Sequence, residues 1–280
     1  MTQRMNIESD CNILGGFSTL GNRLTVRIYT DIRNLDLRSG LKLAIAQQFP
    51  EFPGDSIPLS LGFQRQGLLW RSAILLQWSA CQAMDLEKLR DHAIKSLVPH
   101  RSAGDNFQKN TWQFQVTVTA AGWLELQLLP HSLEIWLDRC GESLLLPHSQ
   151  AIARWSQGEP PAFSWQYLQQ RCDGLGKLAQ DFAAQGSPQW HFEGYTIPEW
   201  EQTLLDATVR LCLALLNDQR GDRHGQTVAK AFWEFHRHCP LFAFYPAQPE
   251  RFWHYCAWIK LVAAIATAYL STAPTEKFVN

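Results

Sequence analysis

The chain has no excess of positive charge. Its 280 residues carry 25 Lys and Arg against 26 Asp and Glu, a formal net charge of −1. Contacts to phosphate supply most of the affinity of a nucleic-acid-binding protein, so such proteins normally show a basic excess. The overall balance of positive and negative charges gives no support for nucleic-acid binding. Such binding would require a local patch of basic residues on the surface.

The apolar runs of exported and membrane proteins are also missing. Residues 1–10 are polar and acidic and contain no apolar core of a secretory signal. The most apolar helical stretch, 257–270, contains Lys260 and is too short to span a bilayer. The seven cysteines are an odd number, and most fall in apolar helical patterns, which favours reduced, buried thiols over a disulfide framework. We expect a soluble, cytoplasmic protein with no membrane partner.

Motifs for catalysis are absent from the sequence. There is no Gly-x-Ser-x-Gly elbow, no His-Glu-x-x-His pair and no dinucleotide fingerprint. The run Gly174–Lys177 resembles a phosphate loop only superficially, because Arg171 and Leu178 stand where that loop requires glycine and Ser or Thr. We therefore expect neither an enzyme nor a bound cofactor.

A metal site is not expected either. His236 and His238 stand two residues apart in a helical pattern, as do His254 and Cys256. Residues two apart on a helix point to nearly opposite faces and cannot share a metal ion. We interpret this group as a core cysteine with surface histidines.

Aromatic side chains, in contrast, are abundant. The chain has 12 Trp and 15 Phe, more than a core of this size requires. Large aromatic side chains pack cores, but they also provide stacking surfaces for bases and anchors for protein partners.

The first half of the chain predicts a small sheet packed by helices. Alternating apolar and polar residues predict strands over 24–30, 112–119 and 123–129. Ala121-Gly122 predicts the turn between the last two strands. Helical spacing predicts helices over 35–48, 68–79, 85–98 and 132–137. Asp85 is the expected N-cap of the third helix.

The second half predicts a helical bundle. Gly and Pro recur over 140–164, which is typical of a connector. Helical periodicity then predicts four helices, over 165–185, 199–217, 227–239 and 248–270. We expect an α+β fold, with an α/β domain over 1–140, a linker over 141–163 and the bundle over 164–280.

The bundle region resembles a known family. The segment Gln166–Arg171 is similar to the Gln-Tyr-Ala-His-Ala-Arg helix that opens the DALR anticodon-binding domain of arginyl-tRNA synthetases. The run Val228–Leu241 resembles that domain's Leu-Ala-x-x-Phe-Asn-x-Phe-Tyr-x-x-Cys-x-Leu helix, and the tail 273–278 resembles its terminal Ala-Pro-Glu-x-Met. The resemblance covers essentially all of 164–280 and implies an all-α bundle of the anticodon-binding type.

Residues 85–137 resemble the N-terminal additional domain of the same synthetases, which grips the D-loop corner of tRNA. The family's turn reads Gly-Phe-(Ile/Leu)-Asn, where this chain has Gly122-Trp123-Leu124-Glu125. The stacking aromatic is thus kept as Trp123, and Glu125 replaces the base-reading asparagine. The sequence contains no His-Ile-Gly-His or Lys-Met-Ser-Lys-Ser motif of the catalytic domain. We therefore expect no activation of arginine.

The resemblance implies a non-catalytic protein that binds tRNA or another structured RNA, and no DNA. Trp123 and Tyr167 would stack on bases and Arg171 would contact phosphate, with Gln170 and His236 as further candidate contacts. The alternative is a protein–protein interaction scaffold that has lost RNA binding. The neutral charge, the changed base-reading positions and the surplus tryptophan favour this alternative, because aromatics dominate protein interfaces.

Overall fold

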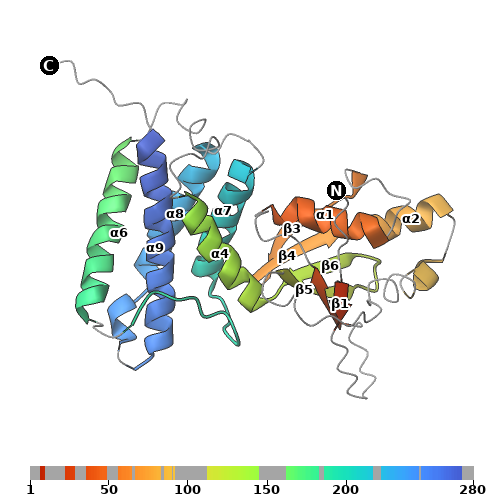
Figure 1. Cartoon of the computed structure of the whole chain (residues 1–280), viewed down its shortest axis with the longest axis horizontal. Coiled ribbons are helices and arrows are strands. Elements are labelled where there is room, and N and C mark those ends of the chain that lie inside the picture. The colour runs from red at the N-terminus through yellow and green to blue at the C-terminus, as the bar shows by residue number, and fades with distance from the viewer. Residues whose placement is uncertain are drawn as a thin grey trace. The chain divides into compact units, whose positions relative to one another are not determined.

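The chain forms two compact units, Met1–Leu133 and Glu134–Asn280. The computed structural model (Figure 1) describes residues 7–9, 23–28, 36–48, 56–64, 67–82, 85–89, 91, 112–144, 162–182, 186–216, 222–245 and 247–272. The division between the units falls within helix α4 (Pro130–Leu144). Residue 140, where we expected the domain boundary, therefore lies inside this helix, and so do residues 141–144 of the expected linker. Residues 145–161 lie outside the described ranges.

The first unit contains an antiparallel sheet. Within the described residues it has six strands in the order β1-β2-β5-β6-β4-β3, and every neighbouring pair is antiparallel. The strands are β1 (Ile7–Ser9), β2 (Arg23–Ile28), β3 (Ser60–Gln64), β4 (Gly67–Ser72), β5 (Trp112–Val118) and β6 (Leu124–Leu128). The predicted strands over 24–30, 112–119 and 123–129 are confirmed as β2, β5 and β6, except that residues 29–30 lie outside the described ranges.

The β5–β6 hairpin shows how the sequence pattern sets the register. Trp112, Phe114, Val116 and Val118 are all buried, while the residues between them are half-buried. Val116 lies opposite Leu126, so apolar side chains from both strands share one face. Gly122 closes the turn with φ of +81°, a conformation that glycine adopts without steric cost.

The helix predicted over 68–79 is wrong in its first part. Residues 68–72 belong to β4, and helix α2 (Ile74–Gln82) begins only after it. The first four residues of β4 are all buried, and because successive side chains point to opposite faces of a sheet, both faces of the strand are covered here. Such a continuous apolar run has no period of two, so it cannot be distinguished from a buried helix by periodicity. The strand β3 was not predicted.

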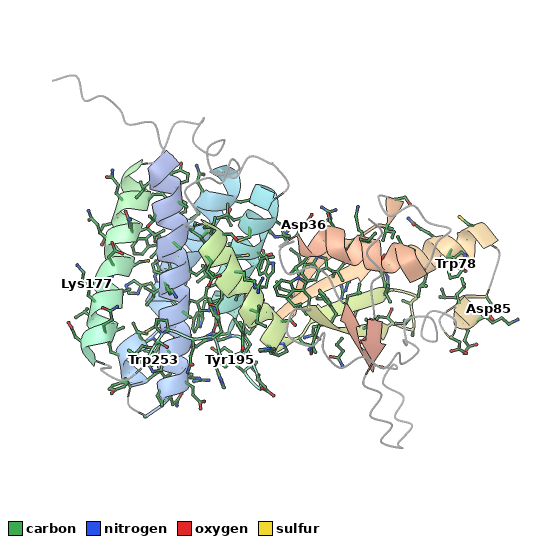
Figure 2. All side chains as sticks on the ribbon, in the orientation of Figure 1. Asp36, Trp78, Asp85, Lys177, Tyr195 and Trp253 are labelled. Carbon is green, nitrogen blue, oxygen red and sulfur yellow. The ribbon has the colours of Figure 1, made fainter. Side chains whose placement is uncertain are left out.

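The remaining helices of this unit begin at polar caps. In α1 (Leu37–Gln48), predicted over 35–48, the Asp36 carboxylate accepts hydrogen bonds from the backbone N–H groups of Arg38 and Ser39 (Figure 2). Asp85 accepts from Glu87 in the same way at the start of helical residues 86–89, as expected of an N-cap. Residues 92–98 of that predicted helix lie outside the described ranges.

The second unit is helical throughout its regular structure. It contains α6 (Ala162–Phe182), α7 (Glu199–Leu216), α8 (Asp222–His238), the short 3₁₀ helix η4 (Leu241–Ala243) and α9 (Pro249–Thr272), together with most of α4. The four helices predicted here are confirmed within the described residues, which leave out 183–185 and 217 of the predicted ranges. Helix α4 is longer than the helix predicted over 132–137. Helix α6 packs along α9 and α7 packs along α8 (Figure 1). The fold is α+β.

Aromatic packing explains much of the tryptophan content. Among the fully buried side chains are Trp70 and Trp112 in the sheet and Trp136, Trp165 and Trp258 in the helices. Trp165 of α6 stacks on Tyr269 of α9 with ring centroids 4.8 Å apart. None of the helices in the described ranges combines the length and the apolar character that a bilayer crossing requires.

Candidate nucleic-acid interface on α6 and α8

Two aromatic side chains form an exposed stack between α6 and α8. The rings of Tyr167 and Trp233 lie with centroids 5.4 Å apart and planes inclined by 22°. Tyr167 is 52% exposed, so about half of its surface stays accessible although the ring is held by its neighbour. The stack is an ordered apolar surface that faces solvent.

One helical turn further along α6, Arg171 is bound to a histidine of α8. Its Nε and Nη2 atoms lie 3.1 and 2.9 Å from Nε2 of His236. A guanidinium can only donate, so His236 Nε2 is the acceptor and carries no proton. Burial and, after it, the positive charge of Arg171 lower the pKa of His236. The imidazole is therefore neutral near pH 7 and leaves the arginine charge intact.

The charge of Arg171 is not balanced by an acid. No carboxylate of the described residues lies within ion-pair distance of it, whereas the nearby Arg237 is paired with Glu234 at 2.9 Å. The His236 ring is itself supported by the buried Phe232, on which it stacks with centroids 6.1 Å apart. We call Tyr167, Arg171, Trp233 and His236 the α6–α8 cluster.

The structure thus brings together three of the five predicted site residues, Tyr167, Arg171 and His236. Gln170 is exposed on α6, three residues after Tyr167 and so on a neighbouring part of the helix surface. Trp123 belongs to the first unit, where it ends the β5–β6 turn and is 38% exposed. Its backbone N–H donates to Thr119 Oγ1 at 3.0 Å.

Glu125, which replaces the family's asparagine, has a partner in the sheet. Its carboxylate accepts from Arg71 Nε at 2.9 Å, across the β4–β6 pairing. This ion pair balances the negative charge beside Trp123.

Trp233 was not predicted as a site residue. The available signal was its position on α8, three residues before His236, since residues three apart share a helix face. Its partner on α6 could be identified only from the packing of the two helices.

A second cluster of polar side chains is buried in the helical unit. The prediction that the histidines are surface residues is wrong for His254, which is 1% exposed. Its Nδ1 accepts the backbone N–H of His191 at 3.0 Å, so its proton lies on Nε2. That Nε2 is 2.5 Å from Oε1 of the buried Glu201, which also accepts from Trp258 Nε1 at 2.9 Å.

The other carboxylate oxygen of Glu201 is also satisfied. The hydroxyl of Tyr195, which Figure 2 labels, donates to Oε2 at 2.7 Å and lies 3.1 Å from the hydroxyl of Tyr255. Burial, with the negative charge of Glu201 as the next cause, raises the pKa of Tyr195, and burial is the main cause that raises the pKa of Tyr255 to about 12. Both hydroxyls stay protonated, and the network fastens the segment 191–195 to α7 and α9.

No group of three or more His, Cys, Asp and Glu side chains in the described part of the chain is arranged to hold a metal ion. No family model, curated protein or solved structure matches the chain.

Proposed function

We propose that the chain is a non-catalytic RNA-binding protein that holds a tRNA or another structured RNA at the α6–α8 cluster. The observation that supports this most is the exposed Tyr167–Trp233 stack beside Arg171, whose charge no described carboxylate balances. Proteins recognise RNA loops mainly by stacking unpaired bases on aromatic rings and guanidinium planes.

Each member of the cluster has a distinct task in this proposal. An unpaired base extends the Tyr167–Trp233 stack on the accessible side of Tyr167. Arg171 uses two of its N–H groups on His236, which leaves about three of the five for a phosphate oxygen. His236 orients the guanidinium and, because it is neutral, does not draw the phosphate away from Arg171.

Binding of total tRNA to the full chain at low and at moderate salt tests the proposal. Tyr167→Ala should weaken binding by about 5- to 150-fold, which corresponds to the roughly 1–3 kcal/mol that one base–aromatic stack contributes. Leu178→Ala is the matched control, since Leu178 is an exposed apolar residue of the same helix outside the stack. Absence of binding at low salt, or an equal loss in both variants, would contradict RNA binding at this cluster.

The protein-scaffold function has one specific observation in its favour. Leu178 is 47% exposed and follows Arg171 by seven residues, so an apolar side chain continues the Tyr167 face of α6. A protein partner would use this whole face, and tRNA would then not bind at any salt concentration. The same titration therefore distinguishes the two functions.

The proposed function is non-catalytic. We expect that mixing the chain with arginine, ATP and tRNA yields no charged tRNA, and measurable charging would overturn this part of the proposal.

A further inference from the structure

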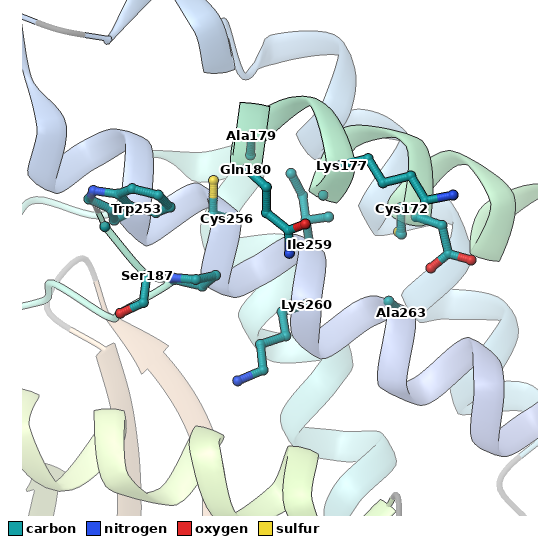
Figure 3. A pocket seen from close by; sticks show the side chains of 14 residues that line it. Cys172, Lys177, Ala179, Gln180, Ser187, Trp253, Cys256, Ile259, Lys260 and Ala263 are labelled. Carbon is teal, nitrogen blue, oxygen red and sulfur yellow. The ribbon is translucent and has the colours of Figure 1, made fainter. Parts of the chain in front are cut away.

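A cavity of about 650 Å³ lies between α6, α9 and the segment 186–188 (Figure 3). Small-molecule sites usually measure about 300–1,000 Å³. The cavity shares no residue with the α6–α8 cluster. Apolar and mostly buried side chains form its inner wall, with Trp253 at one end: Cys172, Ala179, Trp253, Cys256, Ile259 and Ala263.

The two cysteines of this wall carry no charge near neutral pH. Burial raises the pKa of the Cys172 thiol to about 12, and the negative charge of Asp173 contributes after it. Burial alone raises the pKa of Cys256 to about 12. Both side chains act as small apolar groups, so the inner wall suits a hydrocarbon or aromatic body.

The rim of the cavity, in contrast, is positively charged. Lys177 of α6 and Lys260 of α9 both line it and are both exposed. Neither ammonium group has a carboxylate within ion-pair distance among the described residues. Among the described residues of the lining, Asp173 is the only acidic one, so two positive charges and one negative charge leave a net charge of +1 for that set. A ligand with a single negative charge complements this rim.

Gly176 keeps the α6 side of the cavity open. Glycine inside a helix costs about 0.8–1 kcal/mol relative to alanine. Apart from the adjoining residues and backbone of α6, no atom of the described residues lies within 4 Å of the position that a Cβ of Gly176 would occupy, so packing within this set does not require glycine. A larger side chain there would enter the cavity. The lack of a side chain at Gly176 therefore leaves space in the cavity, whereas the packing of α6 against its neighbours does not depend on it.

We propose that this cavity binds a small organic molecule with one negative charge and an apolar body, such as an aliphatic or aryl carboxylate. The apolar body lies against Cys256 and Ile259, and the carboxylate lies at the rim, where both Lys177 and Lys260 attract it. Gln180, which points from α6 into the cavity in Figure 3, supplies a hydrogen-bond donor. Gly176 of the Gly174–Lys177 run acts by leaving space and not as part of a backbone phosphate cradle, because the run lies inside α6.

The test uses the full chain and the fluorescent aryl sulfonate 1-anilinonaphthalene-8-sulfonate, which has one negative charge and an apolar body. We expect saturable binding and displacement by decanoate. Decylamine, with the same chain length and the opposite charge, should not displace the probe. Failure of the probe to bind, or equal displacement by both amphiphiles, would overturn the proposal.

Two glycine variants locate the binding site. Gly176→Leu should weaken binding of the probe at least about tenfold, a loss of roughly 1.4 kcal/mol, by filling the cavity. Gly174→Leu is the control, because Gly174 is two residues away, also has no atom near its Cβ position and does not line the cavity. Both changes raise helix propensity, so the melting temperature should not fall. Equal effects of the two variants on the probe would place binding elsewhere and overturn the proposal.

The lysines account for the charge preference. Lys177→Gln and Lys260→Gln should each weaken decanoate binding by about two- to fivefold, the effect of one exposed charge pair, and leave decanol binding unchanged. Equal losses for decanoate and decanol, or no loss for either, would contradict the role of the rim. The Gly176→Leu variant should bind tRNA as tightly as the unchanged chain does. The cavity ligand and the RNA are thus tested by independent measurements, and either proposal can be contradicted without the other.

Discussion

At the residue scale, two histidines of the helical unit have their ring protons placed by different neighbours. His236 accepts from Arg171 on Nε2 and so keeps its proton on Nδ1. His254 accepts a backbone N–H on Nδ1 and holds the Glu201 carboxylate through Nε2. The first histidine orients a charge toward solvent and the second closes a buried polar network.

The pKa of His236 provides a direct test of its contact with Arg171. Burial is the larger cause that lowers this pKa, and the arginine charge is the second. Arg171→Met removes only the second cause, so the pKa should rise without reaching the ordinary value of about 6.5. Titration of the imidazole signals by NMR measures the change. Arg237→Met is the control and should shift the pKa less, because Arg237 is paired with Glu234.

The same pKa fixes how His236 affects stability. The folded chain binds the proton less readily than the unfolded chain, whose histidine titrates near 6.5. The contribution of His236 to the free energy of unfolding is therefore fully present above about pH 6.5 and is lost as the pH falls below that value.

Glu201 is expected to be important for stability. Glu201→Gln keeps the shape but replaces one acceptor oxygen by an N–H group that faces donors. Hydrogen bonds to charged groups contribute about 1.5–3 kcal/mol each, so the free energy of unfolding should fall by at least that amount. Urea denaturation measures it. Glu199→Gln, an exposed change in the same helix, should cost at most about 1 kcal/mol. Similar losses in the two variants would contradict the buried network.

At the element scale, the helices of the second unit were predictable and part of the sheet was not. Helices α7 and α8 each have one apolar face, and Pro198 precedes the first residue of α7, so both the period and the start signal are visible in the sequence. In β4 neither signal exists, because Gly67–Trp70 is buried on both faces. The boundary between β4 and α2 depends on the neighbouring strands, which local periodicity does not report.

The functional residues also fall into a group that the sequence predicted and a group that it did not. Tyr167, Arg171 and His236 were predicted from the resemblance of short helical patterns. The contacts of Glu201 with His254 and Trp258 join residues 53 and 57 positions apart in the chain, and no local pattern announces them. The cavity beside Gly176 likewise depends on how α6 and α9 pack.

The β5–β6 turn is expected to tolerate only glycine at position 122. Gly122 has φ of +81°, and a Cβ there would lie 2.8 Å from side-chain carbons of Leu76 and Leu86. Gly122→Ala should lower the free energy of unfolding by about 1–3 kcal/mol, mainly through backbone strain. Gly62→Ala is the control, since its Cβ would make only ordinary contact, 3.7 Å from the Leu69 oxygen. Thermal unfolding of both variants measures the difference, and equal stability would contradict the strained turn.

At the scale of the whole molecule, the two candidate RNA contacts belong to different units. Trp123 lies in Met1–Leu133 and the α6–α8 cluster in Glu134–Asn280. Tyr167→Ala should therefore weaken binding of both whole tRNA and an isolated anticodon stem-loop. If Trp123 stacks on the D-loop, as the family resemblance implies, Trp123→Ala should weaken binding of whole tRNA only, because the stem-loop lacks a D-loop. Equal loss of stem-loop binding in both variants would show that the units do not act on separate parts of the RNA.

The position of β1 has a consequence for how the protein behaves in solution. β1 lies at one edge of the sheet and covers β2 only over Val26–Ile28. Within the described residues, a chain shortened past Ser9 would have the six-residue β2 as its edge strand in place of the three-residue β1, which presents a longer row of open backbone N–H and C=O groups to a second molecule. Exposed edges of this kind promote strand addition between molecules. Such a truncated protein should form aggregates at concentrations where the full chain stays dispersed, which light scattering would detect.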